Sequence, residues 1–148
     1  MTTAATLEVR AEPVVIDTMI AGAMVTTSKS NLLTRYRPLL LGHPLVLAFA
    51  TVAELRYGAY RNGWGDSRLA KLEQFFLSVA VVMPDSDLVD ASARLRANCE
   101  RLGHALHAKI HDADRWIAAT AMRYGLPLLS DDGIFDNVPG LMLRRPSD

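Results

Sequence analysis

The chain alternates short runs of aliphatic and β-branched residues with helix-like segments. Val14-Val15-Ile16 is one such run, and it ends in an acid, Asp17. Unbroken apolar runs of this length are typical of parallel strands, because helices cover both faces of a parallel sheet. The predicted strands are Val14–Asp17, Leu45–Phe49, Val79–Met83, Leu128–Ser130 and Leu141–Leu143.

The segments between these strands carry helical periodicity and helix-ending residues. Ser67–Phe76, for example, places its large apolar side chains on one helical face. The predicted helices are Ile20–Val25, Asn31–Leu41, Thr51–Arg61, Ser67–Phe76, Asp85–Leu102 and Asp112–Tyr124, with a connection over Gly103–Ile110. Strand–helix alternation predicts an α/β fold, a three-layer α/β/α sandwich around a mostly parallel sheet. We expect residues 1–12 to be a flexible leader and residues 13–148 to form one domain.

Composition sets broad limits on what the chain can be. Its 148 residues are 50% apolar and 22% charged, with a formal net charge of zero, so it is an ordinary globular chain without a global basic field. The one cysteine, Cys99, forms no internal disulfide and is expected in the core. The acidic leader lacks a signal peptide's apolar segment, and no apolar run is long enough to span a membrane. We therefore expect a cytoplasmic protein that does not contact a membrane.

Acidic residues stand where several predicted strands give way to a helix or turn. Asp17 ends the first strand, Glu54 follows the second, Asp131 and Asp132 follow the fourth, and Asp114 opens the last helix. Carboxyl ends of parallel strands meet at one edge of an open sheet, so these acids should face one crevice. Clustered carboxylates repel one another unless a cation lies between them, and an all-oxygen site suits Mg²⁺ or Mn²⁺.

Each acid also has a purely structural interpretation. Asp17 could cap the first helix. Thr51-x-x-Glu54 matches a capping box, Asp112 is a natural N-cap for the helix that contains Asp114, and the two acids after the fourth strand could form a turn. Independent capping does not predict that four junctions each bring an acid to the same edge, so a cation site remains the better explanation.

Several other polar and aromatic residues have competing interpretations. Three histidines are spaced like ligands on a helix: His104, His107 and His111. The preceding glycine makes that helix doubtful, so we expect solvated loop histidines rather than a zinc site. Three arginines follow one predicted helix: Arg94, Arg96 and Arg101. A solvated face is the default for them and phosphate contact the alternative. Trp64 and Trp116 are expected in the core or an interface.

Four motifs together resemble a known family: Val-Ile-Asp17-Thr; Thr51-Val-Ala-Glu54-Leu with Tyr57-Gly58; Asp114-x-x-Ile-Ala-Ala-Thr-Ala; and Ser130-Asp-Asp132 followed by Phe135. They resemble the PIN-domain ribonucleases, and more narrowly the VapC-type toxins of bacterial toxin–antitoxin pairs. The resemblance extends from about Val14 to Leu143. The motif that begins at Asp114 is its most specific part.

The resemblance implies a compact α/β/α sandwich whose clustered acids bind Mg²⁺ or Mn²⁺ and cleave single-stranded or looped RNA. It also implies a cognate antitoxin that masks the site, and a homodimer. The four acids fall on Asp17, Glu54, Asp114 and Asp132, although Asp131 competes for the last place and Asp112 has no counterpart. Ser130 takes the place of a Ser or Thr that this family often has beside the metal.

A carboxylate-held metal can activate a water for attack on a phosphodiester. We expect Asp17 and Asp114 to be the principal metal ligands, with Glu54 and Asp132 completing the cluster and one of them orienting the water. Arg115 and Ser130 are expected to help hold the phosphate. One rival is a catalytically silent PIN-like module that docks a partner protein. Another is a phosphotransfer enzyme with Asp17 as nucleophile, which the lack of a second Asp two residues later disfavours.

Overall fold

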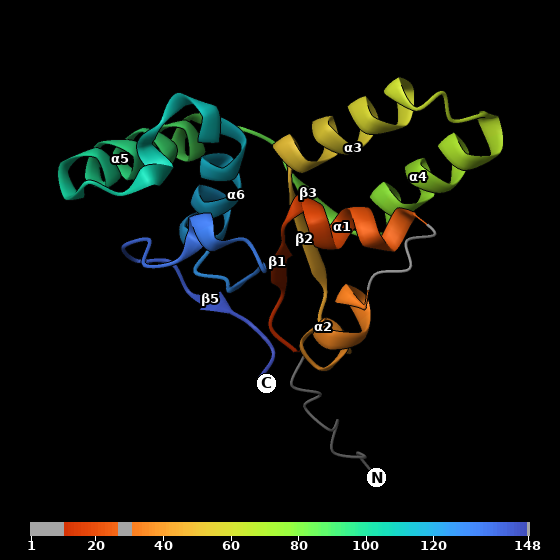
Figure 1. The fold of residues 1–148 in the computed structure, drawn as a ribbon, viewed down its shortest axis with the longest axis horizontal. Helices are drawn as coiled ribbons and strands as arrows, with labels where there is room; N and C mark the ends of the chain where they lie inside the picture. Colours follow the sequence, from red (N-terminus) through yellow and green to blue (C-terminus); the bar gives the residue numbers. More distant parts are fainter. Residues whose placement is uncertain (1–10, 27–30, 148) are drawn as a thin grey trace, which may run out of the picture.

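The computed structural model describes residues 11–26 and 31–147, and these form an α/β sandwich around a five-stranded sheet (Figure 1). The strand order is β3-β2-β1-β4-β5, and every neighbouring pair is parallel. The elements are β1 Val14–Ile16, α1 Thr18–Val25, α2 Leu32–Leu40, β2 Leu45–Ala48, α3 Phe49–Arg61, α4 Asp66–Ser78, β3 Ala80–Val82, α5 Ser86–Leu102, α6 Asp112–Arg123, β4 Leu128–Leu129 and β5 Leu143–Arg144. Three short 3₁₀ turns complete them: η1 Ala105–His107, η2 Lys109–His111 and η3 Gly133–Phe135.

The first strand of the chain lies in the middle of the sheet. Val15 pairs with Val46 of β2 on one side and with Leu128 of β4 on the other. All three residues of β1 are buried, because helices cover both faces of the sheet. Alternation along the strand sends Val14 and Ile16 into one core and Val15 into the other.

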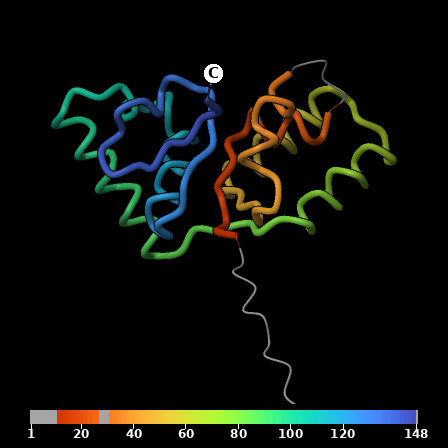
Figure 2. The backbone as a smooth tube through the Cα atoms, turned by 90° about the horizontal axis from the view of Figure 1, so that it is seen from below, coloured from red at the N-terminus to blue at the C-terminus, as the bar shows by residue number. Residues whose placement is uncertain are grey.

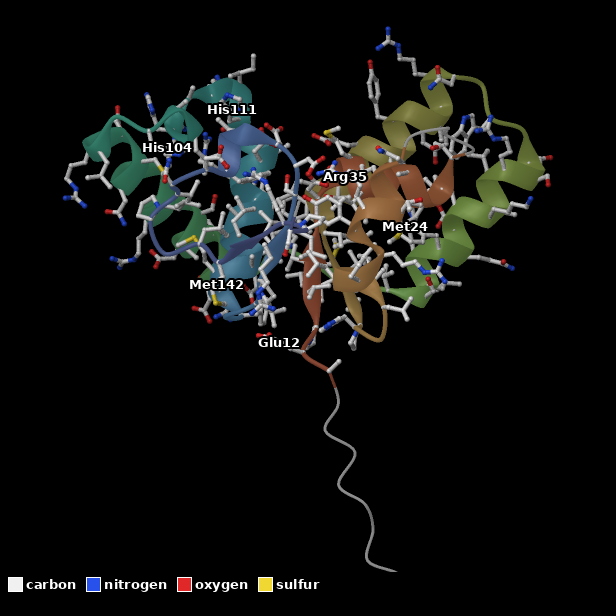
Figure 3. The ribbon with its side chains drawn as sticks, turned by 60° about the horizontal axis from the view of Figure 1, so that its bottom comes forward. Glu12, Met24, Arg35, His104, His111 and Met142 are labelled. Carbon is white, nitrogen blue, oxygen red and sulfur yellow. The ribbon has the colours of Figure 1, made fainter. Side chains whose placement is uncertain are left out.

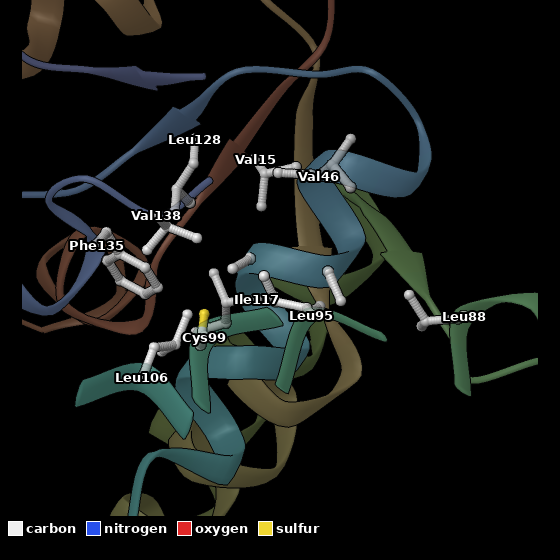
Figure 4. Close-up of a cluster of buried hydrophobic side chains, with 14 residues drawn as sticks. Val15, Val46, Leu88, Leu95, Cys99, Leu106, Ile117, Leu128, Phe135 and Val138 are labelled. Carbon is white, nitrogen blue, oxygen red and sulfur yellow. The ribbon is translucent and has the colours of Figure 1, made fainter. Parts of the chain in front are cut away.

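The two cores lie on opposite faces of the sheet, and Figures 1 and 2 show the corresponding halves as two lobes with β1 between them. One core is built from α1, α2, α3 and α4, with Tyr36, Leu72 and Phe76 among its buried side chains. The other is built from α5, α6, η1 and the segment around η3. Its labelled side chains, Cys99 and Phe135 among them, converge on the sheet in Figure 4.

The predicted fold class is confirmed, with small corrections to element boundaries. Phe49 is not the last residue of a strand but the first of α3, and β5 is Leu143–Arg144 rather than Leu141–Leu143. The predicted connection after α5 contains η1 and η2. It begins at Gly103, whose φ of 71° lies in the left-handed region that glycine adopts without strain. Cys99 is fully buried, as expected.

The leader predicted for residues 1–12 lies almost entirely outside the described residues. Within the described ranges, every helix is too short or too polar to cross a bilayer.

Candidate active site

Asp17 directly follows the central strand and is almost completely buried, with 3% of its surface exposed. Its Oδ1 accepts a hydrogen bond from the backbone N–H of Ile20 at 2.9 Å, so the predicted helix cap is real. Its Oδ2 accepts a very short hydrogen bond from the Ser130 hydroxyl. Burial raises the pKa of Asp17, the two hydrogen bonds lower it, and the charges of Asp132 and Asp131 raise it further. Neither direct partner is a cation, so the carboxylate is costly to keep ionised.

Ser130 joins the ends of two neighbouring strands. It comes directly after β4, is fully buried, and donates to Asp17 across 113 positions of sequence. Its oxygen also accepts the backbone N–H of Asp132 at 3.0 Å. Ser130 therefore holds the loop after β4 against the end of β1, and its hydroxyl is committed to that role rather than to a phosphate.

Asp132 caps the next turn, and an arginine fixes the loop around it. Its Oδ1 accepts the backbone N–H of Ile134 at 3.0 Å, which starts η3. Arg145 donates to the backbone carbonyls of Ser130 and Asp132 at 2.8 and 3.0 Å and pairs with Asp136 at 2.6 Å. One guanidinium therefore sets the positions of two residues at the acidic edge.

Asp131 is neutralised by residues of α2. The guanidinium of Arg35 donates two hydrogen bonds to its carboxylate, at 2.6 and 3.3 Å. The hydroxyl of the fully buried Tyr36 donates a third at 2.7 Å. The hydrogen bonds from Arg35 and then Tyr36 lower the pKa of Asp131. Burial, and next this hydrogen bond, raise the pKa of the Tyr36 hydroxyl. A carboxylate with these partners already has its counter-ion, so Asp131 is a weaker candidate metal ligand than Asp132.

Asp114 lies in the first turn of α6, and a histidine holds it there. Nδ1 of His111 is 2.9 Å from Oδ2 of Asp114, and both side chains are 29% exposed. The carboxylate can only accept, so the imidazole N–H donates. Figure 3 shows His111 and Arg35 on the two different lobes. In Figure 1 α6 runs opposite to the strands, so its first turn lies at their carboxyl ends, where Asp17 also lies.

Glu54 is exposed in the second turn of α3, and the capping-box interpretation of it is wrong. The helix begins at Phe49 with Ala48 in the N-cap position, so Thr51 is already inside the helix. The Thr51 side chain instead lies 3.1 Å from the Thr18 hydroxyl, which ties α3 to α1. With no capping role, Glu54 is left on the exposed face of the helix that follows β2.

Asp112 is not an N-cap either, since it is the first residue of α6 and His111 stands in the N-cap position. It forms a close ion pair with Arg115. Arg115 is buried and also donates to the carbonyls of Leu106 and Ala108 at 2.8 and 2.7 Å. These bonds make Arg115 a brace between α6 and the preceding turns. These contacts do not support the expectation that Arg115 contacts a phosphate beside the acidic residues.

The histidines of the connecting segment are half-exposed and also hydrogen-bonded to the protein. His104 accepts the Leu106 N–H and contacts the Asp136 carbonyl at 2.7 Å, and Nδ1 of His107 lies 2.7 Å from the His104 carbonyl. They do not converge as zinc ligands. Both tryptophans pack against the two cores as expected, with Trp116 edge-on to Phe49 at 5.0 Å.

The sequence did not predict four residues that hydrogen-bond to the acids or to the loop after β4: Arg35, Tyr36, His111 and Arg145. Only His111 had a local signal, a spacing of three residues before Asp114 on a helix start. The others reach the loop after β4 from other parts of the chain, Arg35 across 96 positions.

The donor chemistry of the acidic edge fits a hard divalent cation, because every candidate ligand is a carboxylate or hydroxyl oxygen. Over residues 11–26 and 31–147, however, no three His, Cys, Asp or Glu side chains are already gathered as a metal site. The physical reason is visible in the contacts above. Asp17, Asp131, Asp132 and Asp114 are each turned toward a separate protein partner, so a cation has to draw them together.

The fold of this chain matches solved toxin–antitoxin structures. The VapBC complex of Salmonella typhimurium bound to DNA matches with a TM-score of 0.73 and 21% identity, covering 90% of this chain and 98% of the other. VapBC-5 of Mycobacterium tuberculosis matches with a TM-score of 0.63 and 26% identity, covering 91% and 98%. VapC20 of the same organism, described as a sarcin–ricin loop cleaving toxin, matches with a TM-score of 0.62 and 17% identity, covering 90% and 99%.

No curated protein matches the sequence itself. A family model does: the PIN domain matches residues 14–141, from the first strand to the segment before β5. That match contains every acid discussed above and nearly the whole fold. The chain therefore belongs to the PIN-domain family.

Proposed function

We propose that the chain is a metal-dependent ribonuclease and the toxin of a toxin–antitoxin pair. In this proposal Asp17 and Asp114 hold Mg²⁺ or Mn²⁺, and Glu54 and Asp132 complete the acidic cluster. RNA phosphodiester bonds are the substrate. Support comes from family membership and from the structural similarity to VapC20, a protein described as a sarcin–ricin loop cleaving toxin.

The observation that carries the proposal is the environment of Asp17. A carboxylate that is 97% buried needs compensation, yet its two hydrogen-bond donors are neutral and two further acids raise its pKa. A bound cation supplies that compensation and explains why an acid stands at the end of the central strand. A simple helix cap requires none of this, because an exposed Asn, Ser or Thr would serve.

The surrounding residues position the proposed ligands. Ser130 and the Ile20 N–H orient the two oxygens of Asp17, while His111 orients Asp114. A bound divalent ion would activate a water and stabilise charge on the phosphate. The exposed carboxylate of Glu54, or that of Asp132, would accept a hydrogen bond from the attacking water and set its direction.

The proposed protein partners follow from the same similarity. The neighbouring structures from Salmonella and from Mycobacterium are VapBC toxin–antitoxin complexes, which supports a cognate antitoxin for this chain. An acidic edge also suits inhibition by an arginine, which pairs with carboxylates through two parallel hydrogen bonds. A homodimer and a cytoplasmic location are part of the proposal.

The test is cleavage of RNA by the purified chain, freed of any partner, with Mg²⁺, with Mn²⁺ and with excess EDTA. We expect cleavage only with a divalent ion. The same ion should stabilise the protein against heat by about 2.7 kcal/mol at a concentration a hundredfold above its dissociation constant, and Asp114→Asn should lose most of that gain. Cleavage that persists in EDTA, or that requires Zn²⁺, contradicts the metal assignment.

A second candidate function is a catalytically silent PIN-like module that docks a partner. The lack of a pre-assembled metal site over the described parts of the chain favours it. Metal titration separates the two: a chain that neither gains thermal stability from Mg²⁺ or Mn²⁺ nor cleaves RNA is the silent module.

A further inference from the structure

A second polar site lies between α5 and α6, outside the acidic cluster. It is a cavity of about 300 Å³. Its polar lining comes from five residues: Ser92, Arg96, Asp112, Arg115 and Trp116. Two guanidinium groups and one carboxylate give this lining a net positive charge, although the chain as a whole has none.

The two arginines of the cavity come from different helices, Arg96 from α5 and Arg115 from α6. Asp112 pairs with Arg115, but it is half exposed, and within residues 11–26 and 31–147 no carboxylate pairs with Arg96. An anion in the cavity would lie near both positive charges and would be attracted by each of them.

Arg96 differs from the other two arginines on its helix. Arg94 forms an ion pair with Asp90 at 2.7 Å, and Arg101 donates to Asn98 at 3.2 Å. Arg96 donates through Nε to the His107 carbonyl at 3.1 Å, and the described residues offer no partner to its two terminal nitrogens. Its side chain is therefore anchored at one atom and keeps its terminal donors available at the cavity.

Two further donors line the same cavity without a protein partner among the described residues. Ser92 is 93% buried, and its hydroxyl makes no hydrogen bond to the protein. The indole N–H of Trp116 is likewise unbonded, although its ring is packed against Phe49. No buried side-chain nitrogen or oxygen among the described residues lacks a hydrogen-bond partner, so both of these polar atoms reach solvent in the cavity and are accessible to a ligand there.

We propose that the α5–α6 cavity binds a phosphate group, with Arg96 as the principal contact and the Ser92 hydroxyl as a second donor. Arg115 attracts the phosphate through its charge and not through hydrogen bonds, because its guanidinium already donates to backbone carbonyls. Arginine and hydroxyl donors are the usual partners of phosphate oxygens. Asp112 and Arg115 share the first turn of α6 with Asp114, so the bound phosphate lies at the same end of that helix as the proposed metal ligand.

The site itself depends only on the charges and donors of the cavity. Its assignment to a backbone phosphate of RNA, rather than to a small phosphate-containing molecule, rests on the proposed function. In the RNA case the cavity would hold a phosphate away from the bond that is cleaved and so help position the strand.

Equilibrium dialysis with labelled inorganic phosphate, in EDTA and at constant ionic strength, measures the binding. The Trp64→Phe protein keeps Trp116 as its one remaining tryptophan. Its indole fluorescence therefore reports whether the phosphate binds in the cavity beside Trp116. We expect saturable binding with a matching change in Trp116 emission. Arg96→Gln should weaken it at least fivefold, and Ser92→Ala less. Arg101→Gln is the matched control, an exposed arginine of the same helix, and should change it less than twofold.

No saturable binding, or equal binding by the Arg96→Gln and Arg101→Gln proteins, overturns the site. An RNA oligonucleotide that displaces the phosphate assigns the cavity to the RNA backbone, whereas phosphate binding that RNA does not displace assigns it to a small molecule. Cleavage by the same preparation with Mg²⁺ is scored separately. Cleavage without phosphate binding contradicts only the phosphate site in the cavity. Phosphate binding without cleavage contradicts only the proposed nuclease activity.

Discussion

Asp17 and Asp131 are two carboxylates at the same edge of the sheet, and the protein surrounds them in opposite ways. Asp17 is buried among neutral donors, and its pKa is raised. Asp131 is gripped by Arg35 and Tyr36, and its pKa is lowered. The first therefore lacks the counter-ion that the second already has. The comparison separates an acid suited to hold an external cation from an acid that ties one helix, α2, to the loop after β4.

The largest expected effect concerns catalysis. Asp17→Asn should reduce RNA cleavage by about 100-fold or more, corresponding to roughly 3 kcal/mol of lost transition-state stabilisation. Asn caps a helix as well as Asp does, so the fold should be retained. Asp131→Asn should cost less than about tenfold, because Asp131 acts through Arg35 rather than on the substrate. Single-turnover cleavage with Mg²⁺ measures both. If the two effects are reversed, Asp131 is the fourth acid and the comparison is wrong.

The next effect concerns stability, because substitution of the two residues should change the free energy of unfolding in different directions. Asp131→Ala should lower the free energy of unfolding by about 1.5–3 kcal/mol, because Arg35 and the buried Tyr36 hydroxyl lose a charged acceptor. Asp17→Asn, in EDTA, should leave it unchanged or raise it, since repulsion at the acidic edge falls. Urea unfolding measures both free energies.

Tyr36→Phe serves as the matched control for that measurement. It removes one hydroxyl and keeps the buried ring, so its cost should be about 1 kcal/mol. Combined with Asp131→Ala it should add almost nothing further, because the partner is already gone. Full additivity of the two substitutions would show that the hydroxyl and Asp131 are independent.

The smallest effect is the pH dependence of stability. The pKa of Asp17 is higher in the folded chain than its ordinary value of 3.8, so the folded state binds its proton more tightly, and its contribution to stability falls as the pH rises through the raised pKa. Asp131 has the lowered pKa, so its contribution is present above its ordinary value and is lost as the pH falls through the lowered pKa.

Unfolding in EDTA between about pH 3 and about pH 7 separates these two contributions. The stability of Asp17→Asn relative to wild type should increase with pH. The deficit of Asp131→Asn should shrink toward the acidic end. Parallel curves for the three proteins would mean that neither carboxylate has a perturbed pKa.

Local sequence signals were enough to predict the strands, most helix ends and the role of Asp17 as a cap. Each depends on residues within a few positions, such as the apolar run before Asp17 or Gly103 after α5. The capping box at Thr51 was also a local signal, and it was wrong because α3 starts two residues earlier, where Phe49 packs on Trp116. Packing between elements overrode the local motif.

The partners of the acids could not be predicted because tertiary structure brings them together. Arg35 reaches Asp131 across 96 positions, and nothing in the sequence around either residue indicates the pair. Arg115 is a similar case. Its position next to Asp114 suggested contact with the substrate. In the fold it is buried and donates to backbone carbonyls of the segment that contains η1 and η2.

The position of β1 in the sheet has a consequence for how the protein is made. The central strand, β1, is synthesised before the other four strands of the described sheet. Its second neighbour, β4, and the serine that completes the Asp17 environment follow more than one hundred residues later. Contacts this distant in sequence form late. During most of its synthesis, the nascent chain therefore lacks Ser130 and Asp132, and its acidic cluster is incomplete. Any capacity to cut RNA would therefore be withheld from the messenger and the ribosome that produce it until the last quarter of the chain has emerged.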